Sequence, residues 1–146
     1  MLSTTHALTG GLIVAKVANP LFSLPAILII HYLMDAVPHW DFGTKLRERG
    51  RLKTAVLGIS ELVLALLVSW FLFQKNQPFS PILWLGIFLS LAPDFADSPY
   101  RFLGLNLPFS QKLYQLHHRF HRKHRFFWGF IPQVLIIGLI LLILAS

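Results

Sequence analysis

The chain has 146 residues, of which 55% are hydrophobic and 13% are charged, and its mean hydropathy is +0.61. A soluble domain carries about 25% charged residues, so this composition excludes an ordinary soluble domain and favours an integral membrane protein of one domain. The formal net charge is +7 and there is no cysteine, so any metal must be held by nitrogen and oxygen ligands rather than thiolates.

The apolar segments predict an all-α fold: a polytopic membrane protein with four to five helices plus an amphipathic interfacial helix. The whole chain, residues 1–146, is expected to form a single transmembrane domain. Asn19-Pro20 divides the N-terminal region into two helices that are short for a full span, so we expect a tilted or half-inserted hairpin there. The predicted helices cover about 4–18, 21–36, 52–74, 81–97 and 126–145, and the interfacial helix covers about 109–124.

Lysine and arginine gather in two of the predicted loops, 45–53 and 101–125, whereas the turn between the third and fourth helices holds only Lys75. Cytoplasmic loops carry the excess of these residues, so the first two loops are expected to be cytoplasmic and the turn external. Anionic lipid headgroups are the expected partner of the basic interfacial helix, and no nucleic-acid-binding motif accompanies the charge. The residues expected to bind headgroups are Arg119, Arg122 and Lys123.

The stretch "HYLMD" places His31 and Asp35 four residues apart, on one face of a helix. Two ligands of one metal need this spacing, and an aspartate also commonly orients an imidazole. His39 and Asp41 follow on a turn after Pro38 that can fold back onto the same site. The alternative is an ordinary helix end that faces water.

A second pair of acids, Asp94 and Asp97 in "LAPDFAD", lies three residues apart at the end of an apolar helix. Two like charges so close repel each other unless a cation lies between them, and carboxylates at a membrane boundary are costly unless they are hydrated or paired. A solvated helix end near Arg101 is the alternative.

The stretch "HHRFHRKH" contains four histidines among basic residues. If it is helical, His117, His121 and His124 fall within a narrow arc between an apolar and a basic face. They are then either metal ligands or incidental residues of a polybasic lipid-binding helix. His6 lies in the first turn of the first helix, and Gly10 allows close helix packing.

Glu61 lies alone inside a long apolar segment. An ionisable residue in a membrane span is a functional candidate by default, so Glu61 is predicted to act as a catalytic group, either a ligand or a general base. A protonated glutamic acid that hydrogen-bonds a neighbouring helix is the alternative.

These motifs together resemble small bacterial membrane proteins classed as membrane-bound metal-dependent hydrolases. In that family, short helices carry the signatures TH-x-x-x-G, H-x-x-x-D and LPD-x-DH. Here "TH" with His6 and Gly10 fits the first signature, "HYLMD" fits the second, and Asp94 fits the first acid of the third. The resemblance covers most of the chain and implies a bacterial inner (cytoplasmic) membrane protein. The distribution of lysine and arginine predicts that its polar site faces the cytoplasm.

The resulting prediction is a metal-dependent hydrolase that acts on a lipid or another phosphate or acyl ester at the cytoplasmic face. Its cofactor would be a divalent metal, with zinc expected first and manganese or iron as alternatives. Because so many residues cannot bind one ion, either two ions bind or some residues only support the ligands. The predicted metal-site residues are His6, His31, Asp35, His39, Asp94, Asp97, His117 and His121.

Two other functions remain open. One is a non-catalytic membrane protein that binds anionic lipid through its basic amphipathic helix. The other is a di-iron membrane oxidase, since "HHRFH" partly matches the histidine boxes of membrane hydroxylases and desaturases.

Overall fold

The structure is a computed structural model that describes residues 1–105, 107–122 and 124–146, and over these residues the chain is all helical, without a strand. The long helices are α1 (Ser3–Lys16), α2 (Pro20–Ala36), α4 (Arg51–Ser69), α5 (Pro81–Ser98), α6 (Pro108–Phe120) and α7 (Phe126–Ala145). Short helical turns complete the chain: η1 (Phe42–Lys45), α3 (Leu46–Arg49), η2 (Trp70–Gln74) and η3 (Pro99–Leu103).

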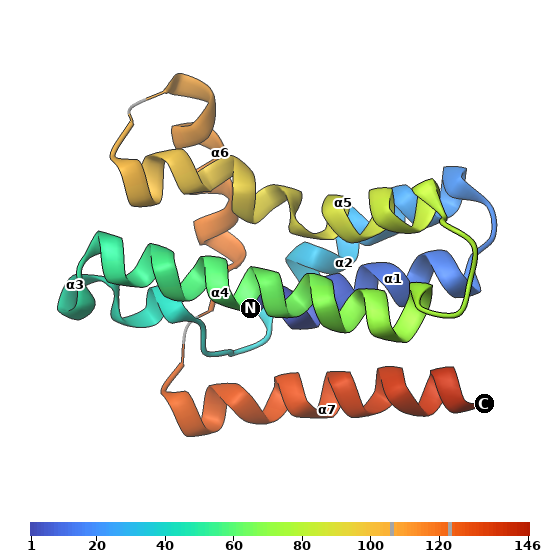
Figure 1. The fold of residues 1–146 in the computed structure, drawn as a ribbon. Coiled ribbons are helices and arrows are strands. Elements are labelled where there is room, and N and C mark those ends of the chain that lie inside the picture. The colour runs from blue at the N-terminus through green and yellow to red at the C-terminus, as the bar shows by residue number, and fades with distance from the viewer. Residues whose placement is uncertain (106, 123) are drawn as a thin grey trace.

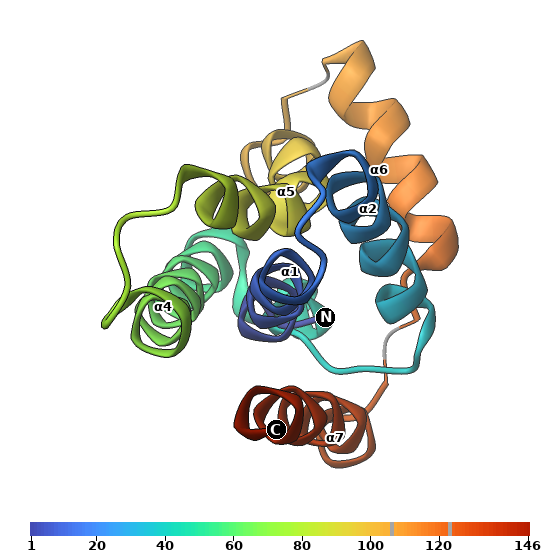
Figure 2. The same ribbon diagram turned by 90° about the vertical axis from the view of Figure 1, so that its right-hand side faces the viewer.

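Helix α1 forms the centre of the bundle. It packs against α2, α4, α5 and α7, which surround it when the bundle is viewed end-on (Figure 2). The turn after α1, the turn after η2 and the C-terminus lie at one end of the bundle, whereas α3 and α6 lie toward the other (Figure 1).

Local sequence signals account for where the helices begin and end. The Asn19 side chain accepts a hydrogen bond from the Leu21 amide and caps α2, and Ser80 caps α5 in the same way. Helix α2 ends at Ala36 because Val37 precedes a proline and adopts an extended conformation.

Helix α6 ends at Phe120, four residues before the predicted end of the interfacial helix, so His124 lies outside it. Main-chain hydrogen bonds explain the early end. The Arg122 amide donates to the Asp35 carbonyl, the His39 amide donates to the Arg122 carbonyl, and the His124 amide donates to the His39 carbonyl. The segment therefore bonds to the end of α2 instead of continuing its own helix.

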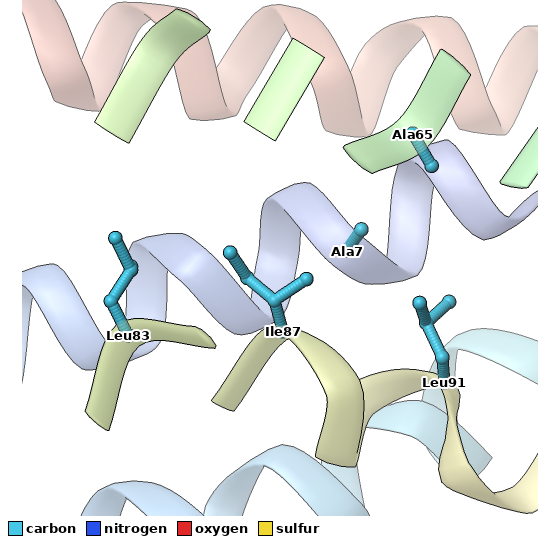
Figure 3. Close-up of a cluster of buried hydrophobic side chains, with 5 residues drawn as sticks. All are labelled: Ala7, Ala65, Leu83, Ile87 and Leu91. Carbon is cyan, nitrogen blue, oxygen red and sulfur yellow. The ribbon is translucent and has the colours of Figure 1, made fainter. Parts of the chain in front are cut away.

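Small residues let α1 approach its neighbours closely. An apolar cluster of Ala7, Ala65, Leu83, Ile87 and Leu91 fills the space between α1, α4 and α5 (Figure 3). A Cβ atom added at Gly10 would lie 2.8 Å from the Gly86 carbonyl oxygen and 2.8 Å from Ser90 Cβ. The contact between α1 and α5 thus requires a glycine at position 10.

Two polar side chains from otherwise apolar helices hold the start of α1. Glu61 of α4 accepts hydrogen bonds from the Ser3 and Thr4 amides and from the Thr4 hydroxyl. Gln133 of α7 accepts from the Leu2 amide and donates to the Trp40 carbonyl. These bonds satisfy the free amides at the start of α1 and join it to α4, α7 and the loop after α2.

Two helical segments, Arg51–Gln74 and Phe126–Ala145, are long and apolar enough to cross a membrane. Both carry many exposed large apolar side chains, including Leu52, Leu64, Leu67, Leu135 and Leu142. Exposed apolar surface of this extent fits contact with lipid.

Replacing Gly10 by leucine is expected to lower the free energy of unfolding by about 1–3 kcal/mol, because the new side chain must push α1 away from α5. Thermal unfolding in detergent measures this change. Gly138→Leu in α7 is the matched control, since a Cβ atom at Gly138 has no neighbour within 4 Å. Equal melting temperatures for the two variants would contradict the close α1–α5 packing.

Candidate metal centre

The carboxylate of Asp35, at the end of α2, lies fully buried at the centre of a histidine cluster. Its Oδ2 atom lies 2.5 Å from His117 Nε2 and 2.9 Å from His121 Nδ1. Its Oδ1 atom lies 3.2 Å from His6 Nε2 and 2.5 Å from the α-amino nitrogen of Met1. A carboxylate this far from water is stable only among positive or strongly donating groups.

Three histidines are anchored through Nδ1 and present Nε2 to Asp35. His31 Nδ1 lies 2.7 Å from the Ser90 carbonyl oxygen, and His39 Nδ1 lies 2.8 Å from the Val37 carbonyl oxygen. Because a carbonyl only accepts, both Nδ1 atoms carry the hydrogen, and each neutral ring presents a lone pair on Nε2. The His31 and His39 Nε2 atoms each lie 3.7 Å from an Asp35 oxygen.

His117 is the third of these histidines. Its Nδ1 atom lies 3.0 Å from Asp97 Oδ2, so the Asp97 carboxylate orients the ring through an Nδ1–H hydrogen bond. Metal-binding histidines typically donate their second ring nitrogen to a carboxylate or a backbone carbonyl in this manner. The buried His31 Nε2 atom has no hydrogen-bond partner among the described residues, which fits a ligand atom whose partner is a metal.

Protonation differs among these rings in the metal-free protein. Burial lowers the pKa of His117, but hydrogen bonds to Asp35 and Asp97 outweigh it and raise the pKa to about 10. Burial, the nearby α-ammonium group and His121 lower the pKa of His39 to about 3. His39 is therefore neutral, whereas His117 holds a proton that metal ligation must release.

His121, which directly follows α6, joins a second acid to the cluster. Its Nε2 atom lies 2.8 Å from Asp41 Oδ2 and 3.1 Å from His39 Nε2. His6 of α1 stacks on the ring of His31, with the ring centroids 4.1 Å apart. Residues from α1, α2, α5, α6 and the loop after α2 thus converge on one buried point.

Two sets of side chains in this cluster have the spacing of metal ligands, with the ligand atoms of each set within 4.8 Å of one another. The first set is His31, Asp35, Asp94 and His117, and the second is Asp35, His39 and His121. Asp35 belongs to both sets, and its Oδ2 atom contacts both His117 of the first set and His121 of the second. The buried histidines and aspartates can therefore hold a metal ion.

The structure brings together all eight residues that the sequence predicts for the metal site. Six belong to the two ligand sets, while His6 contacts Asp35 and Asp97 contacts His117. Glu61 lies outside both sets, and both of its carboxylate oxygens cap α1. Arg119 and Arg122 are exposed beside the cluster, and Lys123 lies outside the described residues.

Asp41, expected to fold back with His39, lies beside His121. Two structural supports of the site were not predicted from the sequence: the Ser90 carbonyl behind His31 and Gln133 behind the loop of His39. Gln133 has a detectable signal, since it is a polar residue within an apolar helix, as Glu61 is. The Ser90 carbonyl has none, because any residue type offers a carbonyl.

A cavity of about 420 Å³ lies beside the cluster, between α4, the end of α5 and the start of the chain. The cluster acids Asp94 and Asp97 and the neighbouring Asp41 line it. The candidate metal site therefore borders a space large enough for a small ligand. Comparison of the chain with known protein families, with curated proteins and with solved structures finds no match.

Protein purified in detergent is expected to carry two equivalents of divalent metal, measured by elemental mass spectrometry. Asp35→Asn should lose both equivalents because Asp35 belongs to both ligand sets. His39→Ala should lose only one, because His39 belongs to a single set.

His124→Ala is the matched control for these metal measurements, because His124 is an exposed histidine outside both sets. It should retain both equivalents. A folded Asp35→Asn variant that keeps both equivalents would show that Asp35 is not a shared ligand.

Glu61→Gln is expected to keep the metal but to lower the free energy of unfolding by about 1.5–3 kcal/mol, because a charged acceptor of amide hydrogen bonds is lost. Thermal unfolding and metal content are measured on the same sample. Loss of metal at an unchanged melting temperature would instead place Glu61 in the metal centre.

Proposed function

We propose that this protein is an integral membrane hydrolase that uses two divalent metal ions to cleave an ester at the cytoplasmic face. One observation carries the proposal: the buried carboxylate of Asp35 is shared by two sets of histidine and aspartate ligands beside a cavity. A site of neutral imidazoles and carboxylates suits zinc first, with manganese or iron as alternatives.

Several residues would hold the metals. His31, Asp94 and His117 would ligate one ion, His39 and His121 the other, and Asp35 both. When bound, a pair of such ions activates water for attack and stabilises the charge that develops on a phosphoryl or acyl oxygen.

The remaining polar groups position these ligands. Asp97 holds the ring of His117, the Ser90 carbonyl holds the ring of His31, and Asp41 holds the ring of His121. Asp94 is the ligand that faces the cavity, with its side chain 26% exposed, so it is the carboxylate best placed to take the proton of an attacking water.

Four or five helices would lie in the bilayer, with α4 and α7 spanning it and α1, α2 and α5 packed among them. Most of the lysines and arginines lie in the segments 45–53 and 101–125. Lys16 ends α1 and Lys75 follows η2, and the turns after these two elements lie at the opposite end of the bundle from α3 (Figure 1). This asymmetry supports a cytoplasmic site, and the resemblance to bacterial proteins supports the inner membrane. The exposed Arg119 and Arg122 would contact anionic headgroups.

The proposal predicts ester hydrolysis that stops when a chelator removes the metal and returns when zinc or manganese is added. Asp97→Asn should lower kcat/KM about 10- to 100-fold, because the ring of His117 loses the carboxylate that orients it. Initial rates on phosphate and carboxylate esters, presented in detergent micelles, measure this effect.

His124→Ala is the control variant for the hydrolysis assay and should retain the wild-type rate. A folded, metal-loaded protein that cleaves neither class of ester would contradict the proposal. If Arg119→Ala/Arg122→Ala then abolished binding to anionic vesicles, the non-catalytic lipid-binding function would be favoured.

A further inference from the structure

The cavity beside the metal centre has an apolar mouth and a wall that is apolar apart from Thr54 and Glu61. Ala55, Gly58 and Leu62 of α4 line it, together with Ile59 and Phe95. Ile59 is 61% exposed and Phe95 is 44% exposed, so both also belong to the outer surface of the bundle. The inner wall is therefore continuous with the apolar exterior between α4 and α5.

The opposite end of the cavity is polar. Asp94 and Asp97 join it to the metal centre, and the Arg101 guanidinium lies over Gly43, where an added Cβ atom would meet Arg101 Nη2. Arg101 Nη2 also lies 3.7 Å from Asp41 Oδ2. An anionic group near the metal centre would thus meet an arginine as well as the metals.

The metal centre is recessed within the length of the apolar helices. The start of α1 bonds to Glu61, ten residues after the first residue of α4, which is about 15 Å along the helix axis. It also bonds to Gln133, seven residues after the start of α7, which is about 10 Å along that axis. A substrate that reaches this depth beside α4 arrives more readily from the bilayer than from water.

We propose that the cavity binds the hydrocarbon chain of a membrane lipid phosphate ester, which enters sideways between α4 and α5 and places its phosphate beside Arg101 and Asp94. This inference rests on the proposed function and names its substrate class. The apolar side chains of the wall can contact the hydrocarbon chain, and the exposed mouth lets the chain enter from the lipid. The arginine and the bound metals can bind the phosphate.

The reaction is the addition of one water across a phosphate ester bond. The water oxygen forms a bond to phosphorus, the bond from phosphorus to the ester oxygen breaks, and the leaving oxygen ends with one water proton as an alcohol. The other proton goes to Asp94 and then to solvent, so no oxidant or further reactant is needed.

Gly58→Phe tests the occupant of the cavity. Gly58 lines the cavity and a Cβ atom there has no neighbour within 4 Å, so a large side chain fills the space without moving the backbone. Gly138→Phe is the matched control, because Gly138 also has open space but lies outside the cavity. Ala55→Leu, at a second lining residue, provides a smaller obstruction if Gly58→Phe does not fold.

The assay compares long-chain phosphatidic acid in mixed micelles with water-soluble p-nitrophenyl phosphate. Gly58→Phe is expected to lower kcat/KM for phosphatidic acid at least tenfold more than it lowers kcat/KM for p-nitrophenyl phosphate, and to keep the wild-type metal content. An equal loss on both substrates, or no loss on phosphatidic acid, would overturn the inference. So would cleavage of a carboxyl ester of the same chain length in place of the phosphate ester.

A binding measurement separates this inference from the proposed function. Phosphatidic acid with a photoreactive acyl chain should label peptides of α4 and α5 in wild-type protein and in Gly138→Phe, but not in Gly58→Phe. If no ester is cleaved and this pattern holds, the hydrolase proposal fails while the lipid site stands. Labelling that is unchanged in Gly58→Phe would overturn the lipid site whatever the activity.

Discussion

The rest of the structure depends on the burial of one carboxylate, that of Asp35. A charge removed from water must be compensated by partners nearby, and here the imidazoles of His6, His31, His39, His117 and His121 all lie around it. These rings come from both ends of the chain, so the need to surround one carboxylate brings α1, α2 and α6 together. Asp35 also belongs to both sets of candidate metal ligands.

Helix α1 connects the buried carboxylate of Asp35 to the apolar helices α4 and α7. Its start is held by Glu61 and Gln133, which satisfy amides that would otherwise be unpaired in an apolar surrounding. A cavity lies beside the candidate metal centre, and the exposed side chains of Ile59 and Phe95 also line it.

Much of this organisation is readable from the sequence, and the exceptions have physical causes. The spacing of His31 and Asp35 places both on one face of α2, and the acids and histidines at other helix ends meet them. The end of α6 was not predictable, because the segment around Arg122 exchanges its helical hydrogen bonds for bonds to Asp35 and His39. Glu61 illustrates the same limit: its isolation in an apolar segment marks it as important, but only its contacts with Ser3 and Thr4 reveal a cap.

By itself, the sequence determined that the protein is all helical, that any metal would be held by histidine and aspartate, and which helix ends carry them. Composition and periodicity suffice for these conclusions, because they depend on residue type and on spacing within one helix. Only the tertiary structure decided that Asp35 is shared between two ligand sets, that Asp97 and the Ser90 carbonyl orient the rings, and that a cavity adjoins them. Those features depend on distances between segments that are far apart in the chain. The packing of the helices around α1 determines these distances, and a local sequence pattern does not predict them.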